Sequence, residues 1–325
     1  MDAAEAEIGE TPVARVQSPM PSLKDPRFTG AFTAITTPFT ADGKTIDYDR
    51  LAAQIEFQAK GEKGTGGVKG IVVCGTTGES PTLSDKEYPE LIKRAVEIGH
   101  KHKLLVIAGT GSNSTAHALE NQEIARHAGA DGTLSVNPYY NKPTQEGLYR
   151  HFAAIADAAG AKLPIILYNI PGRTGVALTP ATVERLSKHQ AIIAVKEATG
   201  STDSASEIAM KCPSLALLSG DDSMTLPFAS VGGVGVVSVV SNILPGRIAA
   251  LCAAFTGGNW DNALRIHREF FDFCRVMFLE TNPIPIKGAL RILGRDTGSL
   301  RLPMCDASAS TMTALRQALT AQGLL

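Results

Sequence analysis

The sequence lacks the markers of several protein classes. Its 31 basic and 32 acidic residues nearly cancel, so no charge excess favours nucleic acid or an anionic membrane surface. No apolar run reaches the roughly 18 residues needed to span a bilayer. The seven histidines show neither HxxxH nor HExxH spacing, and the glycine-rich stretches complete neither a GxGxxG nor a P-loop pattern. We therefore expect no nucleic-acid, membrane, metal or nucleotide partner.

Cysteines are few, and their arrangement argues against a disulfide framework. The five are odd in number and form no CxxC pair, as is typical of reduced cytoplasmic thiols: Cys74, Cys212, Cys252, Cys274 and Cys305. Residues 1–29 are acidic near their start and contain no apolar core, so we expect neither a secretory signal nor a transit peptide there. We expect a cytoplasmic protein with a flexible N-terminal extension over residues 1–29.

Short apolar runs alternate with longer amphipathic stretches from about residue 30 onward. This alternation predicts a parallel sheet with helices outside it. Helix-like stretches such as 84–101, 114–129 and 144–160 begin at capping residues, namely Ser84, Ser114 and Thr144. The strand-like runs number eight, at 30–38, 69–75, 104–111, 132–138, 164–171, 192–200, 215–221 and 234–242.

The number of units favours one α/β architecture over another. Eight strand–helix units over about 225 residues match a closed (β/α)8 TIM barrel, whereas an open doubly wound sheet usually has fewer strands and a glycine-rich first turn. The strand signals stop after residue 258, and helical patterns follow at 259–278, 284–293 and 309–322. We therefore predict a catalytic barrel over 30–258 and a C-terminal helical region over 259–325.

Chemistry in such a barrel is located at the C-terminal ends of the strands. Polar or glycine-containing segments follow five of the predicted strands and would meet at one rim, although they are distant in sequence. They are GTTGES (75–80), NPYYNKP (137–143), YNIPGRTG (168–175), KEATG (196–200) and SGDD (219–222).

Lys196 is the most informative residue of the rim, because it ends the apolar run Ile192–Val195. A lysine at a strand end often extends its amine into solvent. The functional alternative is an amine that burial keeps neutral and nucleophilic, as Schiff-base formation requires. Lowering a lysine pKa from about 10.4 to about 7 takes about 4.6 kcal/mol of differential destabilisation.

Hydroxyl groups near this lysine are candidates for proton transfer. Tyr168 and Tyr140 either pack or carry protons for a Schiff base. Tyr139 precedes Tyr140, and two adjacent tyrosines of a proline-flanked loop cannot both face inward. The backbone of GTTGES suits a carboxylate, and Arg173 is either a surface ion-pair residue or an anion clamp. Cys74 has no histidine near it in sequence, so we interpret it as a packing thiol.

Taken together, the segments GTTGES, PYYNKPTQEGLY, LYNIPGRTG, KEATG, LLSGDD and NPIPIK resemble the dihydrodipicolinate synthase family, in the family's own order and from about residue 30 to the C-terminus. This family belongs to the pyruvate-dependent Schiff-base aldolases and lyases. The resemblance implies condensation of pyruvate with L-aspartate-4-semialdehyde on the diaminopimelate route to lysine. It also implies a homotetramer, a dimer of tight dimers, that needs no organic cofactor or metal.

The resemblance also implies a role for each matching residue. Lys196 matches the Schiff-base lysine, and Thr77, Tyr140 and Tyr168 match the proton relay, with Tyr140 expected to reach in from a neighbouring subunit. The other matches are to substrate-binding positions: Thr76 and Thr77 for the pyruvate carboxylate, Arg173 for the semialdehyde carboxylate, and Gly220 and Val237 for the pocket lining.

One departure from the family pattern concerns inhibition by lysine. Sensitive members hold the inhibitor at the tight dimer interface, partly through a glutamate whose position here is His117. Ser80, Asn113 and Tyr139 still match that site, whereas Asp85 and Tyr88 stand where some sensitive enzymes have histidines. Because a glutamate paired with an ammonium contributes about 1.5–3 kcal/mol, we predict weak or absent inhibition by lysine.

Other functions remain open at this point. N-acetylneuraminate lyase and the 2-keto-3-deoxy sugar-acid aldolases share the barrel and the lysine but take other aldehydes. The arginine of GRTG and the second tyrosine of PYYNKP favour a short carboxylated aldehyde over a polyol. A pyridoxal-phosphate enzyme would need a phosphate loop that we do not find. A barrel retained only as a binding protein is the remote alternative.

Overall fold

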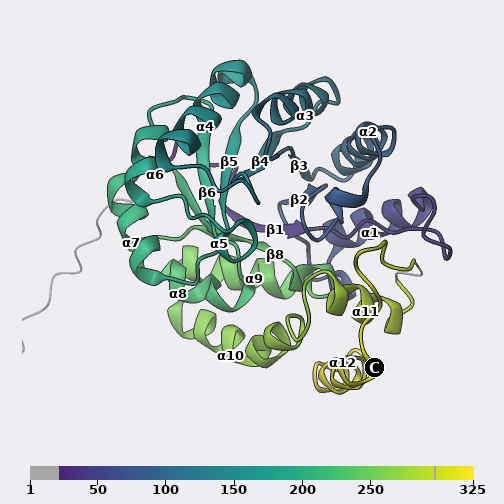
Figure 1. The fold of residues 1–325 in the computed structure, drawn as a ribbon. Coiled ribbons are helices and arrows are strands. Elements are labelled where there is room, and N and C mark those ends of the chain that lie inside the picture. The colour runs from purple at the N-terminus through teal and green to yellow at the C-terminus, as the bar shows by residue number, and fades with distance from the viewer. Residues whose placement is uncertain (1–21, 296–297) are drawn as a thin grey trace, which may run out of the picture.

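A closed barrel of eight parallel strands forms the centre of the protein. The computed structural model describes residues 22–295 and 298–325 (Figure 1). Neighbouring strands pair in chain order from β1 to β8, and β8 pairs with β1. The barrel prediction is thereby confirmed. The strands are β1 (Gly30–Ala34), β2 (Gly70–Val73), β3 (Leu105–Gly109), β4 (Gly132–Val136), β5 (Ile165–Asn169), β6 (Ile192–Glu197), β7 (Ala216–Ser219) and β8 (Gly235–Ser238).

Closure between β1 and β8 depends on two glycines. Gly30 is paired with Gly235, and Gly30 has a φ of 86°, which glycine adopts at low cost. A Cβ on Gly235 would lie 2.1 Å from the carbonyl oxygen of Gly30. A side chain at this position would therefore push the first and last strands apart.

Helices surround the barrel in Figure 1, as the sequence pattern predicts. Side chains of one strand face contribute to the core under the helices, for example Val73 and Val195, while the alternate residues, for example Val72 and Ala194, fill the barrel interior. The helices of this layer are α1 (Tyr48–Lys60), α2 (Glu87–Lys101), α3 (Thr115–His127), α4 (Gln145–Ala159), α6 (Pro180–Leu186), α7 (Thr202–Lys211), α8 (Thr225–Ala229) and α9 (Pro245–Thr256), whereas the short α5 (Pro171–Thr174) lies at the rim after β5.

Two of the three predicted capping residues are N-caps in the structure, whereas α2 begins at Glu87 and its N-cap, Lys86, makes no side-chain capping bond. Ser114 and Thr144 accept hydrogen bonds from backbone N–H groups in the first turns of α3 and α4. Ser84 and Glu87 form a reciprocal capping box, in which the Ser84 hydroxyl accepts from the Glu87 N–H and the Glu87 carboxylate accepts from the Ser84 N–H.

The described part of the segment before β1 contacts the barrel through Phe28 and Lys24. Residues 1–21 of the expected flexible extension lie outside the described residues, and within 22–29 only Phe28 is buried. Phe28 is fully buried and lies 6.2 Å from the ring of Phe32 in the barrel interior. Lys24 donates hydrogen bonds to the carbonyl oxygens of His189 at 2.8 Å and Ile192 at 3.1 Å. A segment this short carries no periodic pattern that would predict these contacts.

Three helices follow the barrel and lie together on one side of it in Figure 1: α10 (Trp260–Val276), α11 (Ile284–Ile292) and α12 (Ala309–Ala321). They occupy the expected C-terminal helical region. α10 packs on α9 and α12, and α11 packs on α12. Within the described part of the chain, no helix combines the length and the apolar character that crossing a membrane would require.

Candidate active site

Lys196 points into the barrel interior near the C-terminal end of β6. The strand register places it between Tyr168 on β5 and Leu218 on β7. Only 5% of its surface is exposed, and its Nζ lies 3.9 Å from the centroid of the Tyr168 ring. A Cβ on Gly220 would lie 3.2 Å from Lys196 Cε, so the glycine leaves room for the lysine side chain.

Burial is the main cause of an unusual charge state at Lys196. It lowers the pKa of the amine from 10.5 to about 7, Asp222 opposes this shift, and Arg173 adds to it. Near pH 7 the amine is therefore about half neutral, whereas an exposed lysine is almost fully charged. Its environment accordingly fits a nucleophile better than a solvent-exposed strand-end lysine.

Tyr168, the register partner of Lys196, lies within hydrogen-bond distance of the Thr76 side chain. Burial raises the pKa of the Tyr168 phenol to about 12, and a side-chain hydrogen bond with Thr76 partly offsets this shift. The phenol therefore stays protonated and can donate a proton to an oxygen that forms beside the amine. Val237, another predicted pocket residue, is buried on β8 with its side chain in the interior cluster.

Asn282, which the sequence analysis did not assign, joins the C-terminal region to the rim. Its side chain is almost fully buried, and its Nδ2 donates to Thr77 Oγ1 at 2.9 Å. Its carbonyl oxygen accepts from Arg173 Nη2 at 3.0 Å. One residue between α10 and α11 therefore positions both a predicted relay hydroxyl and the predicted anion clamp. The only sequence signal was its place at the start of NPIPIK.

Asp222 is a second residue that the sequence analysis did not assign, although it lies within SGDD. It is buried, and burial raises the pKa of its carboxyl to about 6, while hydrogen bonds counteract the shift. The donors are the Ser238 hydroxyl and the backbone N–H groups of Val239, at 2.9 Å, and Val240, at 3.1 Å. Asp222 thus fixes the backbone just after β8 and places a carboxylate where it acts on Lys196.

A cavity of about 540 Å³ opens at the rim, and its lining includes Thr76, Ser80, His117, Tyr139 and Arg173. The structure therefore brings three of the four predicted inhibitor-site residues to the same cavity as two predicted substrate-binding residues. Asn113 is not among the lining residues. Its carbonyl oxygen instead accepts from the side chain of Asn141 at 2.8 Å.

Tyr140 projects away from the rest of the chain. Its side chain is 88% exposed, and its φ of 73° turns the loop at this residue. Tyr139, by contrast, is 40% exposed and lines the rim cavity. The two adjacent tyrosines therefore do face different ways. Cys74 is buried and burial raises the pKa of its thiol, which suits a packing residue.

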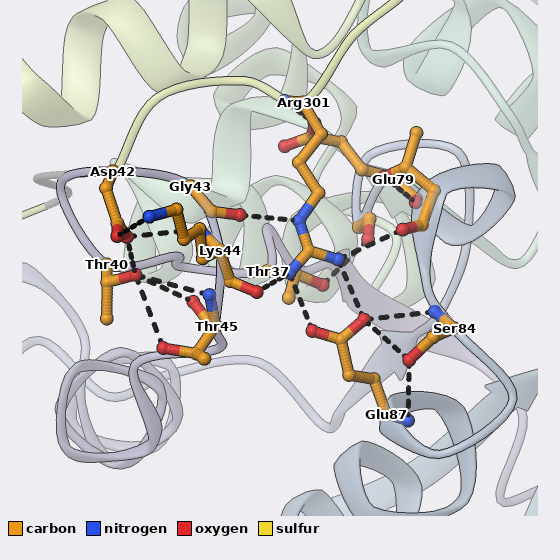
Figure 2. A network of polar contacts seen from close by, with 12 residues as sticks. Thr37, Thr40, Asp42, Gly43, Lys44, Thr45, Glu79, Ser84, Glu87 and Arg301 are labelled. Carbon is orange, nitrogen blue, oxygen red and sulfur yellow. Dashed lines mark hydrogen bonds and ion pairs between the residues drawn. The ribbon is translucent and has the colours of Figure 1, made fainter.

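A buried polar network supports the loop that carries Thr76 and Thr77. Glu79, two residues after Thr77, has a positive φ of 53° and accepts from Lys287 Nζ of α11 at 2.8 Å. Its other oxygen accepts from the backbone N–H of Arg301 at 3.0 Å. Figure 2 shows the Arg301 guanidinium between Glu87 and the loop at residues 43–44. The C-terminal region thereby holds the strand-end loop in place.

No group of three or more His, Cys, Asp or Glu side chains suited to a metal ion occurs among residues 22–295 and 298–325. The described side chains offer an amine that is about half neutral near pH 7, the hydroxyls of Tyr168 and Thr77, and the guanidinium of Arg173, which lines the rim cavity. Such a set can bind a carbonyl compound as an imine and hold a carboxylate beside it.

Comparisons with known proteins agree with this chemistry. The dihydrodipicolinate synthetase family model matches residues 27–322. A 4-hydroxy-tetrahydrodipicolinate synthase from Endomicrobium trichonymphae is 49% identical over 299 residues, which cover 92% of this chain and 99% of that protein.

Solved structures of dihydrodipicolinate synthases are also similar to this chain. The dihydrodipicolinate synthase of Cyanidioschyzon merolae, solved with lysine bound, is 44% identical with a TM-score of 0.88, covering 92% of this chain and 99% of the other. The chloride-inhibited dihydrodipicolinate synthase of Acinetobacter baumannii, complexed with pyruvate, is 37% identical with a TM-score of 0.87, covering 91% and 99%. This chain therefore belongs to the dihydrodipicolinate synthetase family.

Proposed function

We propose that this protein is a lyase that condenses pyruvate with L-aspartate-4-semialdehyde to 4-hydroxy-tetrahydrodipicolinate, on the diaminopimelate route to lysine. The observation that carries the proposal is the buried Lys196, whose amine has a pKa lowered to about 7 within the barrel. The names of the curated relatives support the choice of reaction. The same names favour this reaction over N-acetylneuraminate lyase or sugar-acid aldolase activity.

The chemical steps follow from the amine and the hydroxyls around it. Neutral Lys196 Nζ attacks the ketone carbon of pyruvate, and the resulting carbinolamine loses water to give a Schiff base. Loss of a proton from the methyl group then gives an enamine, whose carbon attacks the aldehyde. Finally the amino group of the added unit attacks the imine carbon, closes the ring and releases Lys196.

Proton transfer in these steps is assigned to Tyr168, Thr77 and Tyr140. The Tyr168 phenol lies against Lys196 and donates to the carbinolamine oxygen, which leaves as water. Thr77 is oriented by Asn282 and continues the relay toward the rim. Tyr140 has no place in the relay of its own chain, because it is 88% exposed. We assign it to the site of a neighbouring subunit.

Substrate carboxylates are assigned to two places on the rim. Backbone N–H and hydroxyl groups of Thr76 and Thr77 hold the carboxylate of pyruvate, while Gly220 and Val237 line the space beside it. Arg173, at the mouth, holds the carboxylate of the semialdehyde and is itself oriented by the carbonyl of Asn282. The reaction as written needs no metal or organic cofactor.

Assembly and location are part of the same proposal. A homotetramer built from two tight dimers would supply the Tyr140 that each site needs. The cytoplasm is proposed because all five cysteines are unpaired. Sedimentation of the wild type and of Tyr140→Phe tests the assembly. The variant should keep the wild-type mass and lose turnover.

The first experiment is to incubate the protein with pyruvate, reduce it with borohydride, and map the adduct by mass spectrometry. We expect a reduced pyruvyl adduct on Lys196. Coupled assays with aspartate semialdehyde, N-acetylneuraminate and a 2-keto-3-deoxy sugar acid then identify the substrate. A folded protein that forms no adduct would refute the Schiff-base mechanism, and an adduct with turnover of only a sugar acid would refute the choice of substrate.

A further inference from the structure

A second cavity, of about 560 Å³, lies between α1 and the end of α11, and none of its lining residues belongs to the site described above. Arg50, Gln54 and Phe57 of α1 form one wall, Leu290 and Arg295 form the other, and Asn242 lies between β8 and α9. Arg50 Nη1 donates to the carbonyl oxygen of Gly294 at 3.0 Å and so joins the two walls. We call this space the α1–α11 cavity.

Gln54, a residue that lines this cavity, carries an unused hydrogen-bond donor. Its side chain is only 7% exposed, and its Oε1 accepts from Thr36 Oγ1 at 3.2 Å. Its buried Nε2 has no hydrogen-bond partner among residues 22–295 and 298–325. Buried side-chain polar atoms usually have a partner, and the amide belongs to a residue that lines the cavity.

Arg295, which also lines the cavity, carries a second unused donor. Its guanidinium carbon lies 3.9 Å from the centroid of the Phe57 ring, which fixes the plane of the group against an apolar surface. Its Nη1 is buried and, within the described part of the chain, has no hydrogen-bond partner. Burial also lowers the pKa of this guanidinium, and the charge of the Glu62 carboxylate partly offsets the shift.

The two donors define the chemistry of a ligand. A guanidinium N–H and an amide N–H both require an acceptor, and a planar carboxylate accepts from such groups with good geometry. Ala53, Phe57 and Leu290 provide an apolar surface beside them. Asp47 and Asp49 also line the cavity and offset the positive charges of Arg50 and Arg295, so a ligand with one negative charge fits better than a ligand with several.

We propose that the α1–α11 cavity binds an organic monocarboxylate with an apolar body, its carboxylate accepting from Arg295 and Gln54 and its body lying against Phe57 and Leu290. The site is separate from the Schiff-base lysine, so the proposal does not depend on the function proposed above. The cavity volume is within the range of about 300–1,000 Å³ that is usual for small-molecule sites.

The test measures binding of 3-phenylpropionate to the full-length protein by calorimetry, with 2-phenylethylamine as the probe that replaces the carboxylate by an ammonium. We expect a dissociation constant of about 1 mM or lower for the carboxylate and no measurable binding of the amine. Arg295→Gln should weaken binding about tenfold or more, and Gln54→Glu, which keeps the acceptor for Thr36 but removes the donor, should do the same.

Two control proteins make the result specific. Arg94→Gln removes another arginine that lies over an aromatic ring, 5.9 Å from the Tyr48 centroid, but outside the cavity, and it should bind like wild type. Lys196→Met should also bind like wild type, because loss of binding there would place the ligand at the other site. The proposal is overturned if the carboxylate does not bind, if the amine binds equally well, or if folded Arg295→Gln retains wild-type affinity.

Discussion

Replacing Lys196 by methionine should make the protein more stable, most strongly at low pH. The pKa of this amine falls from 10.5 when exposed to about 7 in the folded protein. A difference of about 3.5 pKa units, at about 1.36 kcal/mol each, is worth about 5 kcal/mol. Lys196 is buried, so solvent screening does not reduce this figure greatly. Methionine fills a similar volume and has no charge to desolvate.

The sign of the pH dependence follows from the two pKa values. Between about pH 7 and pH 10.5 the unfolded chain binds a proton on this lysine that the folded protein does not bind, so the stability of the wild type rises with pH across this window. Below pH 7 the Lys196 amine is protonated in both the folded and the unfolded protein, so the free energy of unfolding of the wild type is lowered by the full cost of burying the ammonium. Between about pH 6 and about pH 9, the wild type should therefore gain about 2–3 kcal/mol relative to Lys196→Met.

Urea unfolding of both proteins at several pH values, at one fixed protein concentration, measures this difference. Lys101→Met, on the exposed face of α2, controls for the loss of a lysine as such. A stability difference between wild type and Lys196→Met that does not change with pH would refute the reasoning. An independent check is the rate of pyruvate adduct formation, which should rise with pH and level off above about pH 7.

Three further predictions concern residues around the site. Asn282→Ala should lower kcat/KM about tenfold while adduct formation with pyruvate persists, as steady-state kinetics and intact mass would reveal; unchanged kcat/KM would contradict its positioning role. Glu79→Gln should cost about 3–5 kcal/mol in urea unfolding because it breaks a buried ion pair with Lys287, whereas Glu90→Gln, in an exposed pair, should cost about 0–1 kcal/mol. Millimolar lysine should inhibit the wild type weakly and His117→Glu more strongly, and strong inhibition of the wild type would disprove the first half of this prediction.

The barrel could be predicted from the sequence because its signals are local. Each strand is a short apolar run, and a parallel strand that is buried on both faces needs no polar alternation. The place of the site followed from the same runs, since Lys196 and Tyr168 come at or near the ends of two of them. Their positions along the strands, together with the rule that strand ends converge, were sufficient to predict that Lys196 and Tyr168 lie close together.

The supporting contacts could not be predicted in this way, because they join residues far apart in the chain. Asn282 meets Thr77 across 205 positions, and Lys287 meets Glu79 across 208. Neither partner carries a periodic signal that specifies the other. The contacts of Phe28 and Lys24 with the barrel could not be predicted for a related reason, because one phenylalanine and one lysine form no sequence pattern.

Lys196 and Lys287 show why a lysine in an apolar run is an ambiguous signal. Both side chains are at most 5% exposed, and both follow apolar residues in sequence. Lys287 lies 2.8 Å from the carboxylate of Glu79, a geometry that compensates a buried ammonium. Lys196 has no carboxylate within ion-pair distance among the described residues. Its amine lies instead against the ring of Tyr168, its partner on β5. Burial with a partner produces a structural ion pair, whereas burial without one produces a neutral amine. Only the position of the carboxylate in three dimensions decides which lysine can act as a nucleophile.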